Sequence, residues 1–152
     1  MNIRMNIEDL KFAENTYDII VSIAVFEHIK NLQKAVSELH RVLKKGGFAY
    51  IVIHMYPSFS GNHYNLYRSI NKIPPWDHLR SQKRPVPVYL NKGNRNDYIQ
   101  IISEKFKIIN IKLTAEDNIA EKLLTPELLG ELSNYTKEEL LTKAICVVCK
   151  KI

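Results

Sequence analysis

The sequence contains little glycine. It has five glycines in 152 residues, at positions 46, 47, 61, 93 and 130, whereas an average chain of this length has about ten. Their spacing produces neither a G-x-G-x-x-G pattern nor a P-loop. These residues therefore contain no glycine-rich cradle for a phosphate or a dinucleotide.

Cysteines and long apolar runs are equally scarce. Two cysteines do not make a disulfide framework, which favours a cytoplasmic location. Cys146 and Cys149 have C-x-x-C spacing but lie in an expected strand, where alternation places them on opposite faces. We therefore expect structural thiols and not a metal or redox pair. No apolar run approaches the roughly 18 residues of a membrane span, and no signal-peptide segment is visible, so we expect no membrane association.

The remaining composition is that of one globular domain over residues 1–152, with 45% hydrophobic and 25% charged residues. The net charge is +6, and residues 55–105 hold eight Lys and Arg against three Asp and Glu. This basic middle segment predicts an anionic substrate or surface nearby, although a solvated basic loop is an open alternative. Nucleic acid is not favoured as a partner, because no arginine-rich run or nucleic-acid motif is present.

The first half of the chain predicts a strand, a helix and a second strand. Residues 17–22 form a continuous apolar run, which is typical of a strand in a parallel sheet. Asn31 is suited to cap a helix with apolar residues at helical spacing up to Leu43, ended by Lys44, Lys45 and a left-handed Gly46. Residues 48–54 then read as a second buried strand.

The second half begins with an irregular segment. Residues 55–95 contain five of the six prolines and the only tryptophan, and we expect them to form an insert within the domain. Regular elements are expected afterwards at 94–105 (helix), 106–113 (strand), 126–132 (helix), 136–139 (a capping box) and 143–150 (strand). The pattern predicts an α/β fold with about four strands and a mainly parallel sheet.

Histidines follow the carboxyl ends of the first two expected strands, where α/β sheets bind their ligands. The first strand leads into Glu27-His28. The second ends at His54, and the insert adds Tyr56, His63, Trp76 and His78. Imidazoles suit proton transfer near neutral pH, and the alternative is that they hydrogen-bond to loop backbone. A metal site of His54, His63, Asp77 and His78 fits no compact ligand spacing, so we assign no metal ligands.

Two segments carry a family resemblance. The first segment contains Glu8-Asp9-Leu10-Lys11-Phe12, Tyr17-Asp18-Ile19-Ile20 and Glu27-His28-Ile29. The second is Arg41-Val42-Leu43-Lys44-Lys45-Gly46-Gly47. Together they resemble the middle of class I S-adenosylmethionine-dependent methyltransferases of type 11. In that family an acidic-Leu-Pro-Phe turn precedes an F-D-x-V strand and an E-H helix start. Lys11 and Lys45 stand where the family has proline, and Tyr17 where it has phenylalanine.

The resemblance implies a role for each matched position. Asn6 and Ile7 would contact the adenine of S-adenosylmethionine, and Ser22, Ile23 and Ala24 would border its methionine portion. Glu27 and His28 would lie near the transferred methyl group, with His28 as the base. The insert over residues 55–95 would act as a substrate-side lid, with His54, Tyr56, His63, Trp76 and His78 as substrate contacts.

The resemblance also implies that the chain corresponds to the C-terminal portion of such a domain, with the last strand antiparallel and without the glycine-rich cofactor loop. In the family, the strand at 17–24 has a further neighbour. We therefore expect an open apolar edge there that pairs with a second copy of the chain or with an upstream N-terminal half. The expected function is methyl transfer to a small polar or anionic acceptor, with the isolated chain inactive. A non-catalytic remnant or binding module is the alternative, and a histidine-ligated metal hydrolase is a third.

Overall fold

The computed structural model is built around a four-stranded sheet in the order β1-β2-β4-β3, and it describes residues 4–61, 63, 73–80 and 88–152. β1 (Tyr17–Ile23) pairs in parallel with β2 (Leu43–His54). β4 (Thr142–Lys150) runs antiparallel to both β2 and β3 (Lys107–Ala115). The antiparallel last strand is confirmed. The expectation of a mainly parallel sheet was wrong, because a continuous apolar run shows only that both faces of a strand are apolar and does not fix the direction of the neighbouring strands.

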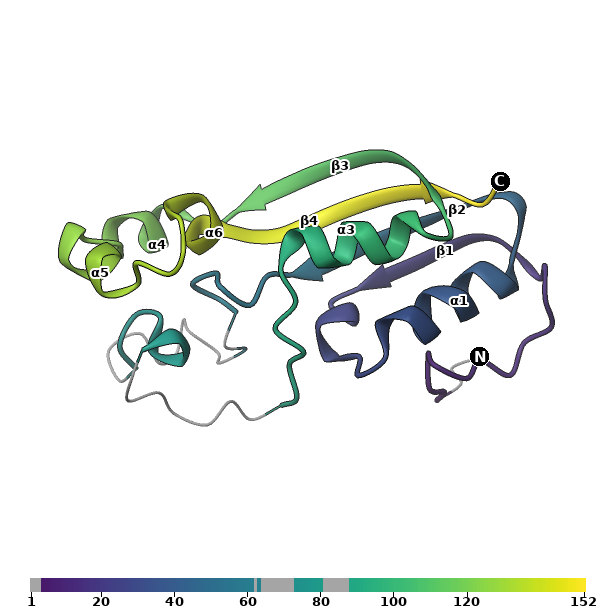
Figure 1. Cartoon of the computed structure of the whole chain (residues 1–152), viewed down its shortest axis with the longest axis horizontal. Helices are drawn as coiled ribbons and strands as arrows, with labels where there is room; N and C mark the ends of the chain where they lie inside the picture. The colour runs from purple at the N-terminus through teal and green to yellow at the C-terminus, as the bar shows by residue number, and fades with distance from the viewer. Residues whose placement is uncertain (1–3, 62, 64–72, 81–87) are drawn as a thin grey trace.

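Two helices cover one face of this sheet (Figure 1). α1 (Leu32–Val42) is capped by Asn31, as predicted, and buries Ala35, Val36, Leu39 and Val42. α3 (Arg95–Ser103) begins with a capping box at Asn94 and buries Tyr98 and Ile102. Apart from Val42, these apolar side chains join the inward side chains of β2 and β4 in the main core. The helical spacing in the sequence therefore places both helices correctly.

The C-terminal end of α1 differs from the prediction. The helix stops at Val42, and Leu43 already belongs to β2; Gly46 does adopt the left-handed conformation (φ 79°), but inside that strand. The last carbonyls of the helix are capped from a distant part of the chain. Lys151 Nζ donates to the carbonyl oxygens of His40 (2.7 Å) and Leu43 (2.8 Å). Local lysines were predicted for this role, but the Lys44 ammonium pairs with Asp18 instead.

Three short helices lie beyond one end of the sheet, at the left of Figure 1. They are α4 (Asn118–Leu123), α5 (Pro126–Glu131) and α6 (Lys137–Leu141). Thr125 caps α5, with proline in its first turn, and Thr136 forms the predicted capping box with Glu139. The insert packs against these helices through a second apolar cluster that contains Phe59 and Trp76. The described part of the insert also includes η2 (Asp77–Leu79).

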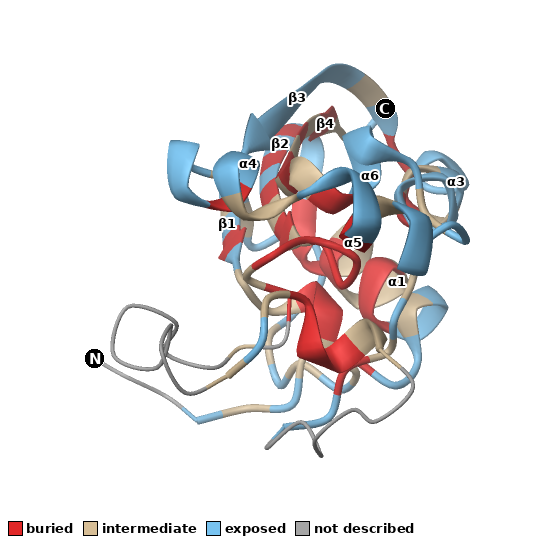
Figure 2. Ribbon diagram, turned by 90° about the vertical axis from the view of Figure 1, so that its left-hand side faces the viewer, coloured by how far each residue is buried: buried red, intermediate tan, exposed pale blue. Residues whose placement is uncertain are grey.

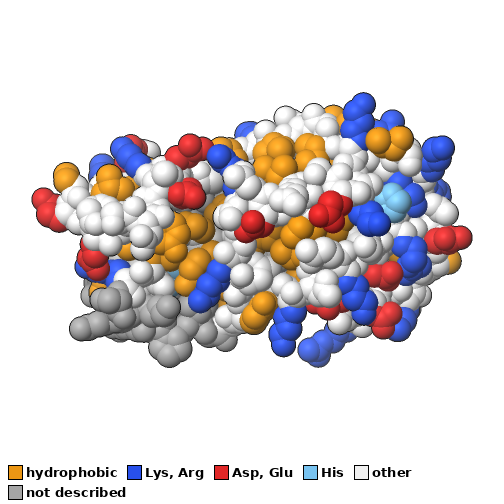
Figure 3. Space-filling model, in the orientation of Figure 1, with side chains coloured by type: hydrophobic (Ala, Val, Ile, Leu, Met, Phe, Trp, Pro, Cys, Tyr) orange, Lys and Arg blue, Asp and Glu red, His pale blue; other side chains and the backbone are white. Residues whose placement is uncertain are grey.

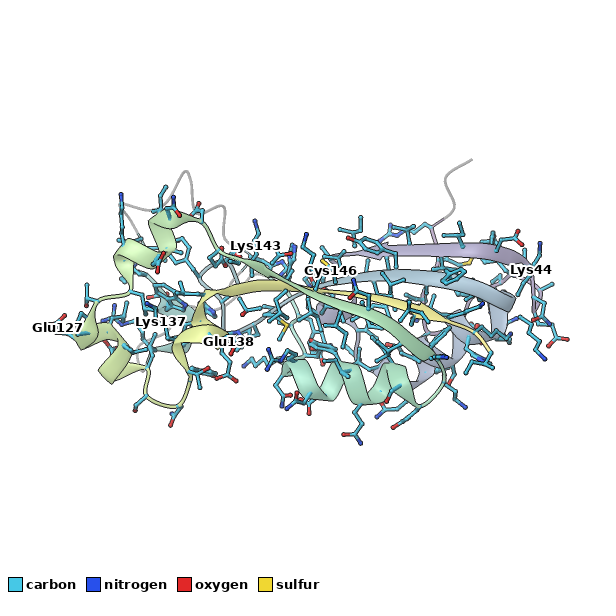
Figure 4. The ribbon with its side chains drawn as sticks, turned by 90° about the horizontal axis from the view of Figure 1, so that it is seen from above. Lys44, Glu127, Lys137, Glu138, Lys143 and Cys146 are labelled. Carbon is cyan, nitrogen blue, oxygen red and sulfur yellow. The ribbon has the colours of Figure 1, made fainter. Side chains whose placement is uncertain are left out.

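The other face of the sheet is apolar and exposed along β1 and β2. Ile19, Val21 and Ile23 are 58–66% exposed, and their neighbours on β2, Phe48 and Tyr50, are about 40% exposed. Register adds Val148 and Cys146 of β4 to this face, and Figure 4 labels Cys146 near the middle of the sheet. Figure 2 shows the resulting bands of exposed and buried residues along these strands. We call these seven residues the open sheet face.

The two cysteines lie on opposite faces of β4. Both cysteines are free, and Cys149 lies in the core while Cys146 lies on the open sheet face, as alternation predicted. Within the part of the chain that the structure describes, no helix is both long enough and apolar enough to cross a membrane.

Candidate functional site

The candidate site lies where β1 and β2 end side by side. Ala24 follows β1 with a left-handed backbone (φ 54°), and its N–H donates to the carbonyl oxygen of Val52. The chain then turns into η1 (Phe26–His28). A positive φ is uncommon for a residue other than glycine, and such strain is concentrated at functional sites. Because the two strands are parallel, this turn and His54 meet at the same edge of the sheet.

Glu27 occupies the centre of the site, and imidazoles surround it. Its side chain is only 3% exposed. His54 Nδ1 lies 3.6 Å and His63 Nε2 3.9 Å from Glu27 Oε1. The rings of His28 and His63 meet edge to face, with centroids 4.8 Å apart. The structure thus brings together four of the predicted residues, from the end of β1, the end of β2 and the insert.

Burial sets the protonation of this cluster. It raises the pKa of the Glu27 carboxyl, and the imidazoles of His54 and His28 oppose that rise. Burial, together with the neighbouring imidazoles of His28 and His54, lowers the pKa of His63 to about 4. At neutral pH His63 is therefore a neutral imidazole with a free lone pair, able to accept a proton or a ligand.

Asn91, which is not among the residues predicted from the sequence, holds the Glu27 turn in place. Its side-chain amide donates to the carbonyl oxygens of Phe26 and Ile29. Its backbone N–H donates to the carbonyl oxygen of Glu27. The Tyr98 hydroxyl donates to the amide oxygen of Asn91. No motif marks Asn91, because it lies near the end of the irregular insert and more than 60 residues from the turn that it contacts.

Tyr56, Trp76 and His78, the other predicted substrate contacts, lie in packed surroundings. His78 Nε2 lies 2.8 Å from the carbonyl oxygen of Tyr56, and the Tyr56 hydroxyl donates to the carbonyl oxygen of His78. Burial lowers the pKa of His78 to about 4. Trp76 is fully buried against the ring of Phe59. These contacts hold the insert together, and the substrate role of the three residues stays a prediction.

Three of the five residues predicted to contact the cofactor line a groove along β1. The groove has a volume of about 550 Å³ and is lined by Ile7, Ser22 and Ile23 together with apolar side chains of the N-terminal segment, β1 and α1. Within the described residues, the buried hydroxyl of Ser22 has no hydrogen-bond partner. Asn6 is exposed, and its side-chain oxygen accepts the backbone N–H of Glu8. Ala24 is half-buried at the end of the strand.

Two other surface features lie apart from this site. A cavity of about 390 Å³ between the start of α3 and the start of α6 contains none of the predicted residues. At the end of the molecule that holds the C-terminus, Figure 3 shows basic and acidic side chains interspersed. Four residues of the basic middle segment, Arg68, Lys72, Lys83 and Arg84, lie outside the described residues, as do other parts of the predicted 55–95 lid.

Comparison with known proteins adds independent information. Residues 2–51 match the family model described as a methyltransferase domain. No curated protein sequence matches the chain. Solved structures match nearly all of it. One is a chain of the complex between the Haloferax volcanii Trm112 methyltransferase activator and a methyltransferase (14% identity, TM-score 0.59, 97% of this chain and 59% of that chain).

Two further structures have similar scores. They are SAM-dependent methyltransferases from Methanosarcina mazei (15% identity, TM-score 0.58, 97% of this chain and 65% of that chain) and Mesorhizobium loti (12% identity, TM-score 0.60, 98% and 68%). The chain thus spans about three fifths to two thirds of these proteins. The sheet order, the matched segment and these structures agree, and the chain has the fold of the class I S-adenosylmethionine-dependent methyltransferases.

Proposed function

We propose that the chain takes part in methyl transfer from S-adenosylmethionine to a small polar or anionic acceptor. The observation that carries the proposal is the Glu27-His28 turn at the end of β1, with His54 and His63 beside it. In α/β sheets, ligands bind beyond the carboxyl ends of the strands. Polar groups of this site converge at that position, as an acceptor with a removable proton requires.

His28 is the proposed base. Its Nδ1 lies 2.9 Å from the carbonyl oxygen of Tyr89, so that nitrogen carries a proton, and in the neutral imidazole the free lone pair is on Nε2. Nε2 is then able to accept the proton of a hydroxyl or an amine. The buried Glu27 stabilises the imidazolium that results, since the two groups interact electrostatically. When bound, the cofactor supplies an electrophilic methyl group, and the protein supplies alignment and exclusion of water.

The residues that line the groove along β1 suit some parts of S-adenosylmethionine and not others. The unpartnered Ser22 hydroxyl is a suitable hydrogen-bonding group for the methionine portion, and Ile7 offers an apolar surface to the adenine. The groove is otherwise mainly apolar, and the sequence has no glycine-rich loop. We therefore propose that this chain alone binds the cofactor weakly and is inactive in isolation. A further polypeptide segment or chain would complete the site.

A second candidate function is that of a non-catalytic binding module, and the open sheet face favours it. Ile19, Val21 and Ile23 project from a strand whose outer edge has no neighbouring strand among the described residues. An apolar edge of this kind is normally covered. We propose that a second copy of the chain covers it, with an upstream N-terminal half as the other outcome. A cytoplasmic location stays a prediction that rests on the two free cysteines.

Calorimetric titration of the chain with S-adenosylmethionine and with S-adenosylhomocysteine tests the proposal. We expect weak binding to the wild-type chain, and weaker binding to a Ser22→Ala variant. An Asn96→Ala variant on the first turn of α3 is the matched control. No heat at millimolar ligand would reject cofactor binding by this chain and favour the binding module. If binding is seen, a mixture of possible acceptors with labelled cofactor tests transfer. We expect none from the chain alone, and transfer by it would show that no further polypeptide is needed; in that case His28→Gln is expected to abolish the transfer.

A further inference from the structure

The Glu27 carboxyl group is almost fully buried, beside imidazoles that do not hydrogen-bond to it. Its side chain is 3% exposed, and neither of its oxygens has a hydrogen-bond partner within the described part of the chain. A buried carboxylate without hydrogen bonds is strongly unfavourable unless a cation compensates it. The nearest imidazole nitrogen, His54 Nδ1, is 3.6 Å away, which is too far for a good hydrogen bond. This arrangement leaves Glu27 available to a cation.

Two imidazoles share that space with the carboxylate. One ligand atom each of Glu27, His28 and His63 lies within 4.8 Å of the other two. With metal–ligand bonds of about 2.0–2.2 Å, the ligand atoms of a tetrahedral zinc site lie about 3.3 Å apart. The cluster therefore needs only a small inward movement to surround an ion. We propose that Glu27, His28 and His63 form a binding site for a divalent transition-metal ion.

Neighbouring groups orient two of these ligands as metal ligands are usually oriented. His28 Nδ1 lies 2.9 Å from the carbonyl oxygen of Tyr89, and a histidine that binds metal usually donates its other ring N–H to such an acceptor. His54 adds a third imidazole beside the carboxylate, 3.6 Å from the Glu27 oxygen that lies 3.9 Å from His63. Asn91 fixes the backbone on both sides of Glu27.

The ligand types indicate which metals suit the site. Two imidazole nitrogens and one carboxylate oxygen suit Zn²⁺, and also Fe²⁺, Co²⁺ or Ni²⁺, better than Mg²⁺ or Ca²⁺, which prefer oxygen ligands. Three protein ligands leave at least one position open for water or for an oxygen of a bound molecule. This group differs from the set considered from the sequence, since His78 bonds to backbone elsewhere. The inference does not rest on methyl transfer, and it is an alternative to the base role of His28, because a nitrogen bound to a metal ion cannot accept a proton.

Metal titration of the untagged chain tests the site. After removal of metals with a chelator, calorimetry with Zn²⁺ is expected to show one ion per chain with a dissociation constant in the micromolar range or below. Co²⁺ is expected to develop visible absorption bands with the intensity of a four- or five-coordinate site. Mg²⁺ is the negative control. Absence of stoichiometric binding of Zn²⁺ and Co²⁺ would overturn the proposal.

Variants separate this site from adventitious binding. Glu27→Gln and His63→Ala are each expected to weaken Zn²⁺ binding at least about 100-fold, whereas His40→Asn, which removes an imidazole on α1, leaves it unchanged. Glu27→Gln preserves the side-chain shape and removes only the charge, and circular dichroism verifies its folding. Zn²⁺ should raise the melting temperature of the wild-type chain and of His40→Asn but not of the other two variants. Unchanged binding by both site variants would reject the assignment, whatever the result of the cofactor titration.

Discussion

The side-chain amide of Asn91 donates a hydrogen bond to the backbone carbonyl oxygen of Phe26, with a nitrogen–oxygen distance of 2.7 Å. The same amide bonds to Ile29, so that it spans the short helical turn that presents Glu27 and His28. Phe26 and Ile29 are both buried in the main core. The geometry of the candidate site therefore depends on a residue near the end of the insert.

Replacement of Asn91 tests this dependence. Asn91→Ala removes a hydrogen bond from each of two carbonyl oxygens of the turn and leaves that of Ile29 without this partner, and we expect the free energy of unfolding to fall by about 2–3 kcal/mol. Denaturant unfolding measures the change. Asn96→Ala, at an exposed position of α3, is the control and should change stability by no more than about 0.5 kcal/mol. A loss as small as that of the control would show that the turn is stable without Asn91.

The sequence predicts the elements of this fold better than their assembly. Caps at Asn31, Thr125 and Thr136 were recognisable because capping depends on residues a few positions apart. Strand direction was not recognisable, because burial determines an apolar run and the run is the same in parallel and antiparallel strands. The convergence of Glu27, His28 and His54 followed from the strand ends. The contacts of Asn91 and Lys151 did not, since they join segments more than 60 residues apart and no local pattern encodes them.

Lys151 is expected to stabilise α1 from the far end of the chain. Its ammonium donates to the carbonyl oxygens of His40 and Leu43 and to the side chain of Asn15. Lys151→Met keeps the length of the side chain but removes the charge and the donors, and we expect a loss of about 1–2 kcal/mol. The exposed Lys45→Met is the matched control. Equal stability of the two variants in denaturant unfolding would contradict a capping role.

Glu38 makes the stability of the N-terminal segment dependent on pH. Hydrogen bonding to the Arg41 side chain lowers the pKa of Glu38 to about 2 from an ordinary value of 4.5, and Arg41 in turn donates to the carbonyl oxygens of Leu10 and Phe12. Because the folded-state pKa is depressed, the stabilisation is present above about pH 4.5. It is lost as the pH falls toward 2, where the folded protein also takes up the proton.

The corresponding experiment compares wild type with Glu38→Gln at pH 6 and pH 3. We expect the wild type to be more stable by about 1–2 kcal/mol at pH 6, a figure reduced for the partial exposure of the pair, and the difference to shrink at pH 3. Glu104→Gln, at an exposed position after α3, should show neither effect. A difference between wild type and Glu38→Gln that stays constant across this range would show that the contribution of Glu38 is not electrostatic.

The open sheet face is expected to mediate self-association. Val21 and Tyr50 are direct neighbours on β1 and β2, 61% and 39% exposed, and a double Val21→Lys, Tyr50→Lys variant places two charges at the centre of this face. If two copies pack face to face, four like charges meet, and we expect the dissociation constant of the dimer to rise at least tenfold, or about 1.4 kcal/mol. Light scattering and sedimentation over a range of concentrations measure it. Ile119→Lys, on α4 and 45% exposed, is the control for an added surface charge. A wild-type chain that stays monomeric at high concentration would reject the homodimer and leave an upstream N-terminal half as the polypeptide to test against the same face.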